Sequence, residues 1–157
     1  IIYAISALDE PSEQVVALLD MWRENLGVQV DVGRIPPDVY FYFLEAAPKN
    51  LFDYGWVADY PDPHNFLDVL FHSGSASNVG NYSNLEVDAL LDKARVEQDW
   101  QKRIQMYQQA EVMLVDDAAA IPTHFGRSYM LVKPYVQNMV FTRFGMIDLS
   151  EVRLSRR

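Results

Sequence analysis

Hydrophobic and polar residues along the first third of the chain follow a pattern that predicts a β-α-β unit. The run Ile1–Ser6 is typical of a strand. We expect a helix to start near Asp9–Pro11, because acids and proline favour a first turn. Its apolar face then recurs at helical spacing, at Val15, Leu19, Trp22 and Leu26. Gly27 is placed to end this helix, and the alternating residues 28–35 predict a second, parallel strand.

The next region combines an aromatic helix with a break imposed by proline. Asp38 is placed to cap a short helix over Val39–Ala47. The apolar run Leu51–Ala58 then predicts a strand buried on both faces, the type found in sheets covered by helices. Pro61 and Pro63 hold the residues before them in extended geometry. The pattern therefore predicts a stiff corner at the carboxyl end of a strand, where ligands collect in open α/β sheets.

The second half of the chain predicts three helices. A short one at Asn65–Phe71 is followed by the loop 73–84, which is rich in Ser, Gly and Asn. The next helix begins after Ser83 or Asn84, since Ser83 and Glu86 have capping-box spacing. Its buried stripe consists of Val87, Leu90, Leu91 and Ala94. A further helix follows an Asp99 cap, from Trp100 to about Val115, with Ile104, Tyr107, Ala110 and Leu114 facing inward. Strands are expected around Ile121–Phe125, Ser128–Val132 and Val140–Phe144.

Composition narrows the classes of function. A chain of 157 residues, half of them hydrophobic, suits one domain with a real core. The formal net charge of -9 argues against nucleic acid or an anionic membrane surface as a partner. No apolar run approaches the roughly 20 residues of a membrane span, so no direct membrane insertion is expected. The first residues lack the basic and apolar regions of a signal peptide, and the absence of cysteine excludes thiolate chemistry.

Asp59, which lies between Trp56 and Tyr60, is the main candidate for binding chemistry. A carboxylate partly enclosed by aromatic rings attracts an ammonium group strongly, because little water screens the two charges. The alternative is that Asp59 caps the helix near Asn65 or holds the proline turn, as acids in such turns commonly do. Asp62 is expected in that turn or cap role in either case. Trp56 and Tyr60 either line an apolar pocket or pack in the core, and both interpretations stay open.

Two motifs, GWVADYPDPHNFL and NYSNLEVDALLDKA, closely resemble the solute-binding proteins of ABC importers for peptides, opines and nickel. The resemblance extends from Met21–Val30 to Val132–Val136. It implies an α/β fold, a periplasmic-binding-protein type II lobe with a mixed, mostly parallel sheet flanked by helices. Members of this family are far longer, so residues 1–157 are expected to form a single lobe, the C-terminal one, of a two-lobed protein. A chain that opens on a strand-like segment agrees with such a fragment.

The resemblance also implies roles for individual residues. Asp59 would pair with the α-amino group of a bound peptide. Backbone groups near Gly55, Trp56 and Val57 would bond the ligand main chain as an added strand would, and Tyr60 completes the expected binding set. The implied partners are a peptide or similar small solute and an ABC permease complex at the membrane. The implied location is the periplasm, or the outside of the cell with a lipid anchor. No enzymatic activity, cofactor or metal is expected.

Alternatives to solute binding rest on scattered acids and histidines. His64 and His72, together with Asp59, Asp62 and Asp68, are possible metal ligands, but they lack HxxxH or HExxH spacing. A hydrolase that uses Asp59 and Asp62 as acids and His64 as base is a second hypothesis. The sequence, however, contains no GxSxG elbow, cysteine or glycine-rich phosphate loop for such an enzyme. A protein-interaction module is the third.

Overall fold

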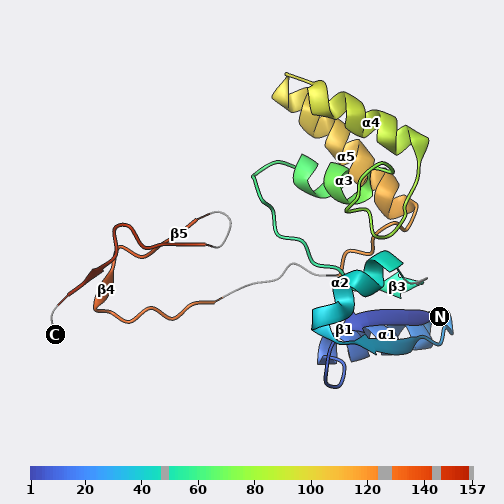
Figure 1. Cartoon of the computed structure of the whole chain (residues 1–157), viewed down its shortest axis with the longest axis horizontal. Coiled ribbons are helices and arrows are strands. Elements are labelled where there is room, and N and C mark those ends of the chain that lie inside the picture. The colour runs from blue at the N-terminus through green and yellow to red at the C-terminus, as the bar shows by residue number, and fades with distance from the viewer. Residues whose placement is uncertain (47–49, 124–128, 143–145, 156–157) are drawn as a thin grey trace. The chain divides into compact units, whose positions relative to one another are not determined.

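The computed structural model describes residues 1–46, 50–123, 129–142 and 146–155 (Figure 1). The chain divides into two compact units, Ile1–Trp56 and Val57–Arg157. We call them the sheet unit and the helical unit and describe each by itself. Whether they form one lobe, as expected from the sequence, stays a prediction.

The sheet unit contains the predicted parallel β-α-β arrangement. Strands β1 (Ile2–Ser6), β2 (Asp31–Ile35) and β3 (Leu51–Phe52) form a sheet in the order β2-β1-β3. The β1–β2 pair is parallel along its whole length. Because β1 is the central strand, its Ala4 and Ile5 are buried. The predicted β-α-β unit is thereby confirmed.

Helix α1 (Glu13–Leu26) connects the first two strands. It begins later than Asp9–Pro11, because Ser12 is the N-cap and its Oγ accepts a hydrogen bond from the Val15 N–H at 3.4 Å. The helix ends as predicted at Gly27, whose φ of 63° is left-handed. Val15, Leu19 and Trp22 of its apolar stripe are half-buried, Leu26 is exposed, and no residue of the helix is fully buried.

Helix α2 (Pro37–Ala46) is fastened to the sheet through Tyr40. The Tyr40 hydroxyl lies 2.9 Å from the Ala4 carbonyl oxygen and 2.6 Å from that of Asp53. Burial, and after it the charge of Asp53, raises the pKa of Tyr40 to about 12. The helix starts before Asp38, since Pro37 fits a first helical position, so Asp38 lies in the first turn and not at the cap.

The predicted strand over Leu51–Ala58 is wrong beyond Phe52. The Asp53 N–H donates a backbone hydrogen bond toward β1, to the Ala4 carbonyl at 2.9 Å, and residues 53–58 are not in a strand. Nor is the run buried on both faces, because Val57 is 77% exposed. Apolar composition favoured a strand here, but it could not supply a neighbouring strand. The proline corner therefore does not directly follow a strand.

Three helices build the helical unit, and Figure 1 shows them packed together: α3 (His64–Phe71), α4 (Leu85–Val96) and α5 (Trp100–Asp116). The cluster of fully buried residues lies on the predicted faces of α4 and α5 and consists of Val87, Leu91, Ala94, Tyr107, Ala110 and Leu114. Leu90 packs against this cluster while half-buried. The helical periodicity of the sequence is thus confirmed by the packing.

The caps of the two long helices agree with the residues expected from the sequence, and for α4 the structure selects one of two alternatives. Asp99 caps α5 as predicted, and its Oδ1 accepts from the N–H groups of Gln101 and Lys102. For α4 the cap is Asn84, whose Oδ1 accepts from Glu86 N at 2.9 Å. Of the two caps that the sequence allowed, Ser83 and Asn84, the structure has Asn84, so the capping-box spacing of Ser83 and Glu86 does not mark the helix start.

The chain after α5 forms two short antiparallel pairs. Strand β4 (Val136–Gln137) pairs with β7 (Arg153–Leu154), and β5 (Val140–Phe141) pairs with β6 (Ile147–Asp148). The strand predicted at Val140 is confirmed over its first two residues. Residues 121–123 and 129–132 are not in strands, and the other residues of those predictions, 124–128 and 143–144, lie outside the described part. Within the described ranges, no helix has the length and apolarity needed to cross a membrane.

Candidate ligand-binding site

The proline corner predicted at residues 60–63 leads directly into α3. The Asp62 N–H donates to the Tyr60 carbonyl at 2.9 Å, which closes a tight turn. The Asp62 Oδ1 in turn accepts from the His64 N–H at 2.9 Å, at the start of the helix. The turn role predicted for Asp62 is therefore confirmed, whereas the N-cap position of α3 is Pro63.

Asp62 has a second partner that the sequence reasoning missed. Arg103 of α5 donates from Nη1 and Nη2 to the two Asp62 oxygens, the Nη2–Oδ1 distance being 2.8 Å. The Arg103 side chain also donates from Nε to the Ala94 carbonyl at 3.0 Å, and its guanidinium lies 5.1 Å from the Tyr107 ring centroid. This bidentate pair fastens the corner to α5. The available signal was an arginine four residues before the buried Tyr107, on the same helix face.

The Asp62–Arg103 pair also fixes the charge of Asp62. Partial burial by itself would raise the pKa of Asp62, but the hydrogen bonds from Arg103 and His64 N–H, with the Arg103 charge, outweigh it and lower that pKa. The hydrogen bonds to Asp62 likewise raise the pKa of Arg103. Both groups are therefore ionised at neutral pH and neutralise each other.

Asp59 lies at the surface, against the buried side chain of Asn65. The Asp59 N–H donates to Asn65 Oδ1 at 3.0 Å, and Asn65 Nδ2 donates to Asp59 Oδ2 at 3.2 Å. Asn65 belongs to the first turn of α3 and is only 2% exposed. Among the described residues, no main-chain N–H of α3 donates to the Asp59 carboxylate. The alternative in which Asp59 caps α3 is therefore seen only as a hydrogen bond to the Asn65 side chain.

Tyr60 is held by the residue next to Asn65. Its hydroxyl lies 2.5 Å from His64 Nδ1, and the two ring centroids are 5.9 Å apart. With Tyr60 as donor, His64 carries its proton on Nε2, which lies 3.7 Å from Asp68 Oδ2. Arg95 in turn donates to both oxygens of Asp68, so a chain of polar contacts runs from the corner to α4. Tyr60 keeps 39% of its surface exposed.

The other three predicted binding residues lie on the extended segment before the corner. A Cβ added at Gly55 would meet nothing within 4 Å, so this glycine borders open space in the structure. Trp56 is half-buried, its ring 6.4 Å from that of Tyr54, and Val57 is exposed. Gly55 and Trp56 end the sheet unit, whereas Val57, Asp59 and Tyr60 belong to the helical unit. The structure therefore brings Asp59 and Tyr60 together on one corner. Val57 belongs to the same unit, whereas Gly55 and Trp56 belong to the other one.

The possible metal ligands are distributed over different contacts. Asp62 pairs with Arg103, Asp68 pairs with Arg95, and His72 Nδ1 accepts from the Gly74 N–H at 3.0 Å. In the part of the chain that the structure describes, no three His, Cys, Asp or Glu side chains are arranged to hold a metal ion. Because Arg103 binds its carboxylate, Asp62 is poorly suited to the proton transfer that the hydrolase hypothesis requires.

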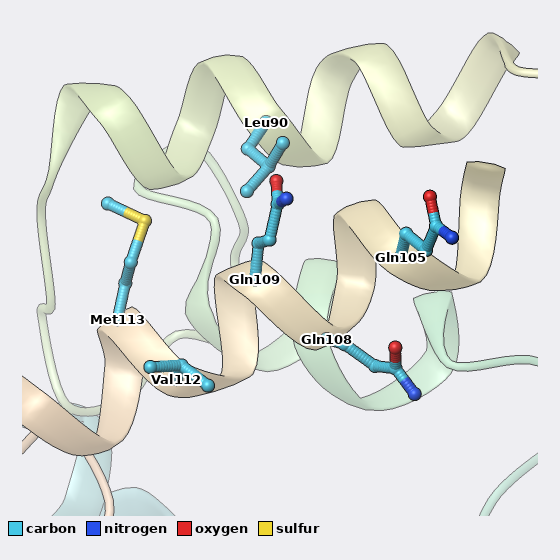
Figure 2. A pocket seen from close by; sticks show the side chains of 6 residues that line it. All are labelled: Leu90, Gln105, Gln108, Gln109, Val112 and Met113. Carbon is cyan, nitrogen blue, oxygen red and sulfur yellow. The ribbon is translucent and has the colours of Figure 1, made fainter.

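A shallow groove lies elsewhere, between α4 and α5. Figure 2 shows its lining, which consists of Leu90, Gln105, Gln108, Gln109, Val112 and Met113. Neutral amides and aliphatic side chains line it, and it shares no residue with the predicted binding set. It does not contribute to the candidate site.

Comparison with known proteins adds relatives to this geometry. No family model matches the chain. It is 36% identical over 128 residues to the probable deoxycholate-binding periplasmic protein YgiS of Escherichia coli K12, which covers 82% of this chain and 24% of the relative. It is 34% identical over 125 residues to the periplasmic oligopeptide-binding protein OppA of Salmonella typhimurium, with coverage of 77% and 22%. The chain belongs to the oligopeptide- and dipeptide-binding family of solute-binding proteins.

A solved structure of this family supports the fold as well. The dipeptide-binding protein from a Pseudoalteromonas species, in complex with Met-Leu, superposes with a TM-score of 0.75 at 25% identity, over 98% of this chain and 32% of that one. The expected α/β fold of the type II periplasmic binding proteins is thereby confirmed. This family member spans only about a quarter of the curated relatives, 24% and 22% of their lengths.

Proposed function

We propose that the chain is part of a solute-binding protein that captures a peptide, or a related small solute, for an ABC importer. The names of the relatives support this proposal, since they include an oligopeptide-binding protein and a deoxycholate-binding one. The reported relatives are named for binding and not for catalysis. A binding protein needs only a difference in affinity between its states to signal a transporter, so no reaction has to be assigned.

The single observation that carries the peptide reading is the state of Asp59. The residue is exposed and its carboxylate is hydrogen-bonded by a neutral amide; among the described residues it has no arginine contact of the kind that neutralises Asp62 and Asp68. Such a group is open to the α-amino group of a peptide. The attraction between unit charges 4 Å apart is about 1 kcal/mol in water and about 4 kcal/mol at the effective dielectric near a protein surface. Exclusion of water around a bound ligand would therefore make Asp59 an effective anchor.

The extended segment before Asp59 suits the ligand main chain. In the part of the chain that the structure describes, residues 54–58, which follow Asp53, are not in a strand. A peptide that adds to such a segment gains main-chain hydrogen bonds without any reading of its side chains. Gly55, Trp56 and Val57 are the residues we assign to this contact, and Tyr60, with its exposed ring, is assigned to the same binding set.

The partner and the location follow the same proposal. The solute would be handed to an ABC permease complex, and the protein would act in the periplasm, where the named relatives are placed by their titles. Attachment to the outer face of a membrane by a lipid anchor remains part of the proposal for an organism without a periplasm.

The test is Asp59→Asn in the full-length protein. Calorimetry would compare trialanine, which has a free amine, with N-acetyl-trialanine. Truncation of a desolvated charge pair costs about 2 kcal/mol or more, so trialanine should bind roughly 30-fold more weakly to the variant. The acetylated peptide should bind both proteins alike. Asp116→Asn, an exposed acid on α5, is the matched control. Unchanged trialanine binding by Asp59→Asn would remove the anchoring role.

A further inference from the structure

Three aspartates surround the start of α3, and they have different partners. Asp62 receives two hydrogen bonds from Arg103, and Asp68 receives hydrogen bonds from Arg95, the shortest of them 2.8 Å. Asp59 receives its hydrogen bond from the amide of Asn65. A guanidinium cancels the charge of the carboxylate that it binds, whereas a neutral amide orients a carboxylate and leaves its charge available.

Asn65 contacts residue 59 at both of its polar ends. Oδ1 accepts from the Asp59 N–H at 3.0 Å while Nδ2 donates to Oδ2 at 3.2 Å, an arrangement in which each amide atom faces a group of the correct polarity. One residue thus fixes both the main chain and the carboxylate of Asp59. One carboxylate oxygen is used in this way, and within the described ranges the other acceptor positions of Asp59 stay available to a ligand cation.

Asn65 is itself held rigidly. It is 2% exposed, and its own N–H donates to the Asp62 carbonyl at 3.0 Å. Asp62 is in turn fastened to α5 by Arg103. An exposed aspartate without such support would distribute over several staggered rotamers, and a ligand would have to select one of them. A fixed side chain avoids that loss of affinity.

We propose that Asn65 is a positioning residue that presents the Asp59 carboxylate, still charged, to the amino group of the ligand. This inference rests on the proposed function, in which Asp59 receives that amine. Asn65 itself need not touch the ligand. Its effect is restricted to ligands that use the amine, and it disappears once Asp59 has lost its charge.

The experiment is a double-mutant cycle in the full-length protein. Asp59→Asn, Asn65→Ala and the combined variant would be titrated calorimetrically with trialanine and with N-acetyl-trialanine. Loss of the pre-set orientation corresponds to about one immobilised side chain, so Asn65→Ala should weaken trialanine binding roughly three- to tenfold. Binding of the acetylated peptide should be unchanged. In the Asp59→Asn background, Asn65→Ala should have no further effect on trialanine.

A purely structural role would give a different result. Asn65→Ala would then weaken both peptides alike, and its effect would add to that of Asp59→Asn; either finding overturns the inference. Asn65→Ser, whose short hydroxyl suits a first helical turn, repeats the test if the alanine variant unfolds at lower temperature. If Asp59→Asn does not change the preference for the free amine, the proposed function fails instead, and the two failures are told apart.

Discussion

The helical unit and the sheet unit differ in how completely they bury their apolar side chains. Helices α4 and α5 bury six residues almost completely among themselves, and α3 packs on the same cluster. In the sheet unit α1 has no fully buried residue, and the α2 side chains Phe41 and Tyr42 are 49% and 69% exposed. Helices α3, α4 and α5 therefore form a core among themselves. The sheet unit leaves apolar faces of the kind that pack against another surface.

This difference matters for the candidate site, because Asp59 and Tyr60 are held by residues of the three-helix core. Asp59 and Tyr60 are held by Asn65 and His64 of α3, and the corner is tied to α5 by Arg103. Gly55 and Trp56 lie at the end of the sheet unit, on a segment with no ladder bonds after Asp53. The proposed amine anchor, Asp59, is thus expected to be rigid, whereas the proposed main-chain contact is expected to adapt to the ligand.

The largest expected effect tests the difference in burial. Leu91→Ala in α4 removes a side chain that is 0% exposed and should lower the free energy of unfolding by about 2–5 kcal/mol. The matched variant Leu19→Ala in the half-buried stripe of α1 should cost less than half as much, because its site is open to solvent on one side. Urea unfolding of the full-length protein measures both. Equal losses would mean that α1 is packed as completely as α4.

The next effect compares two ion pairs. Asp62→Asn should cost about 1.5–3 kcal/mol at pH 7, since it removes the charge that two guanidinium hydrogen bonds engage, with the side chains only 21% and 17% exposed. Glu10→Gln breaks the exposed Arg34–Glu10 pair of the sheet unit and should cost less than about 1 kcal/mol. Denaturation in high salt would sharpen the contrast, because the exposed pair should lose its contribution first.

The pH dependence of the Asp62 pair has a definite sign. Its pKa in the folded protein is lowered, so its stabilisation is complete above the unfolded value of about 3.9 and is lost as the pH falls through the lower folded value. The wild type should therefore lose more stability than Asp62→Asn on acidification below about pH 5. Parallel acid unfolding curves for the two proteins would contradict the assignment.

The helices were predictable because their information is local. Apolar residues at helical spacing marked the buried faces of α4 and α5, and Gly27 and Asp99 marked a helix end and a helix start. Strands depend on partners that are distant in sequence. The run Leu51–Ala58 was apolar enough for a strand, yet only Leu51 and Phe52 meet β1, so composition overestimated its length.

The local structure of the candidate site was predictable in the same limited way. The prolines located the turn at Asp62, whereas the binding roles of Asp59 and Tyr60 stay predictions. Arg103 was not found, because it lies 41 residues from its partner and nothing in the motif refers to it. Asn65 was named only as a helix start, since the sequence does not reveal that its amide turns back toward Asp59.

A smaller effect separates two neighbouring residues at the start of α4. Asn84→Ala should cost about 1 kcal/mol of stability, because Asn84 Oδ1 accepts the N–H groups of the first turn. Ser83→Ala, which would break the capping box expected from the sequence, should change stability by no more than about 0.5 kcal/mol. Thermal unfolding of both variants decides between them. A larger loss of stability for Ser83→Ala than for Asn84→Ala would support Ser83 as the helix cap instead.

The smallest expected change in stability, at Gly55, also gives the sharpest test of the sheet unit's part in binding. A Cβ there meets no atom within 4 Å, so Gly55→Ala should leave stability unchanged or raise it by about 0.4–1 kcal/mol. At Gly33 a Cβ would stand 3.2 Å from Ile2 Cγ2, so Gly33→Ala is the control in which crowding is expected to cost stability. If a ligand main chain lies along residues 55–57, the Gly55→Ala methyl group should weaken trialanine and N-acetyl-trialanine equally, because this contact does not involve the amine. Affinity that survives this substitution would restrict the ligand contacts to the corner on the three-helix core.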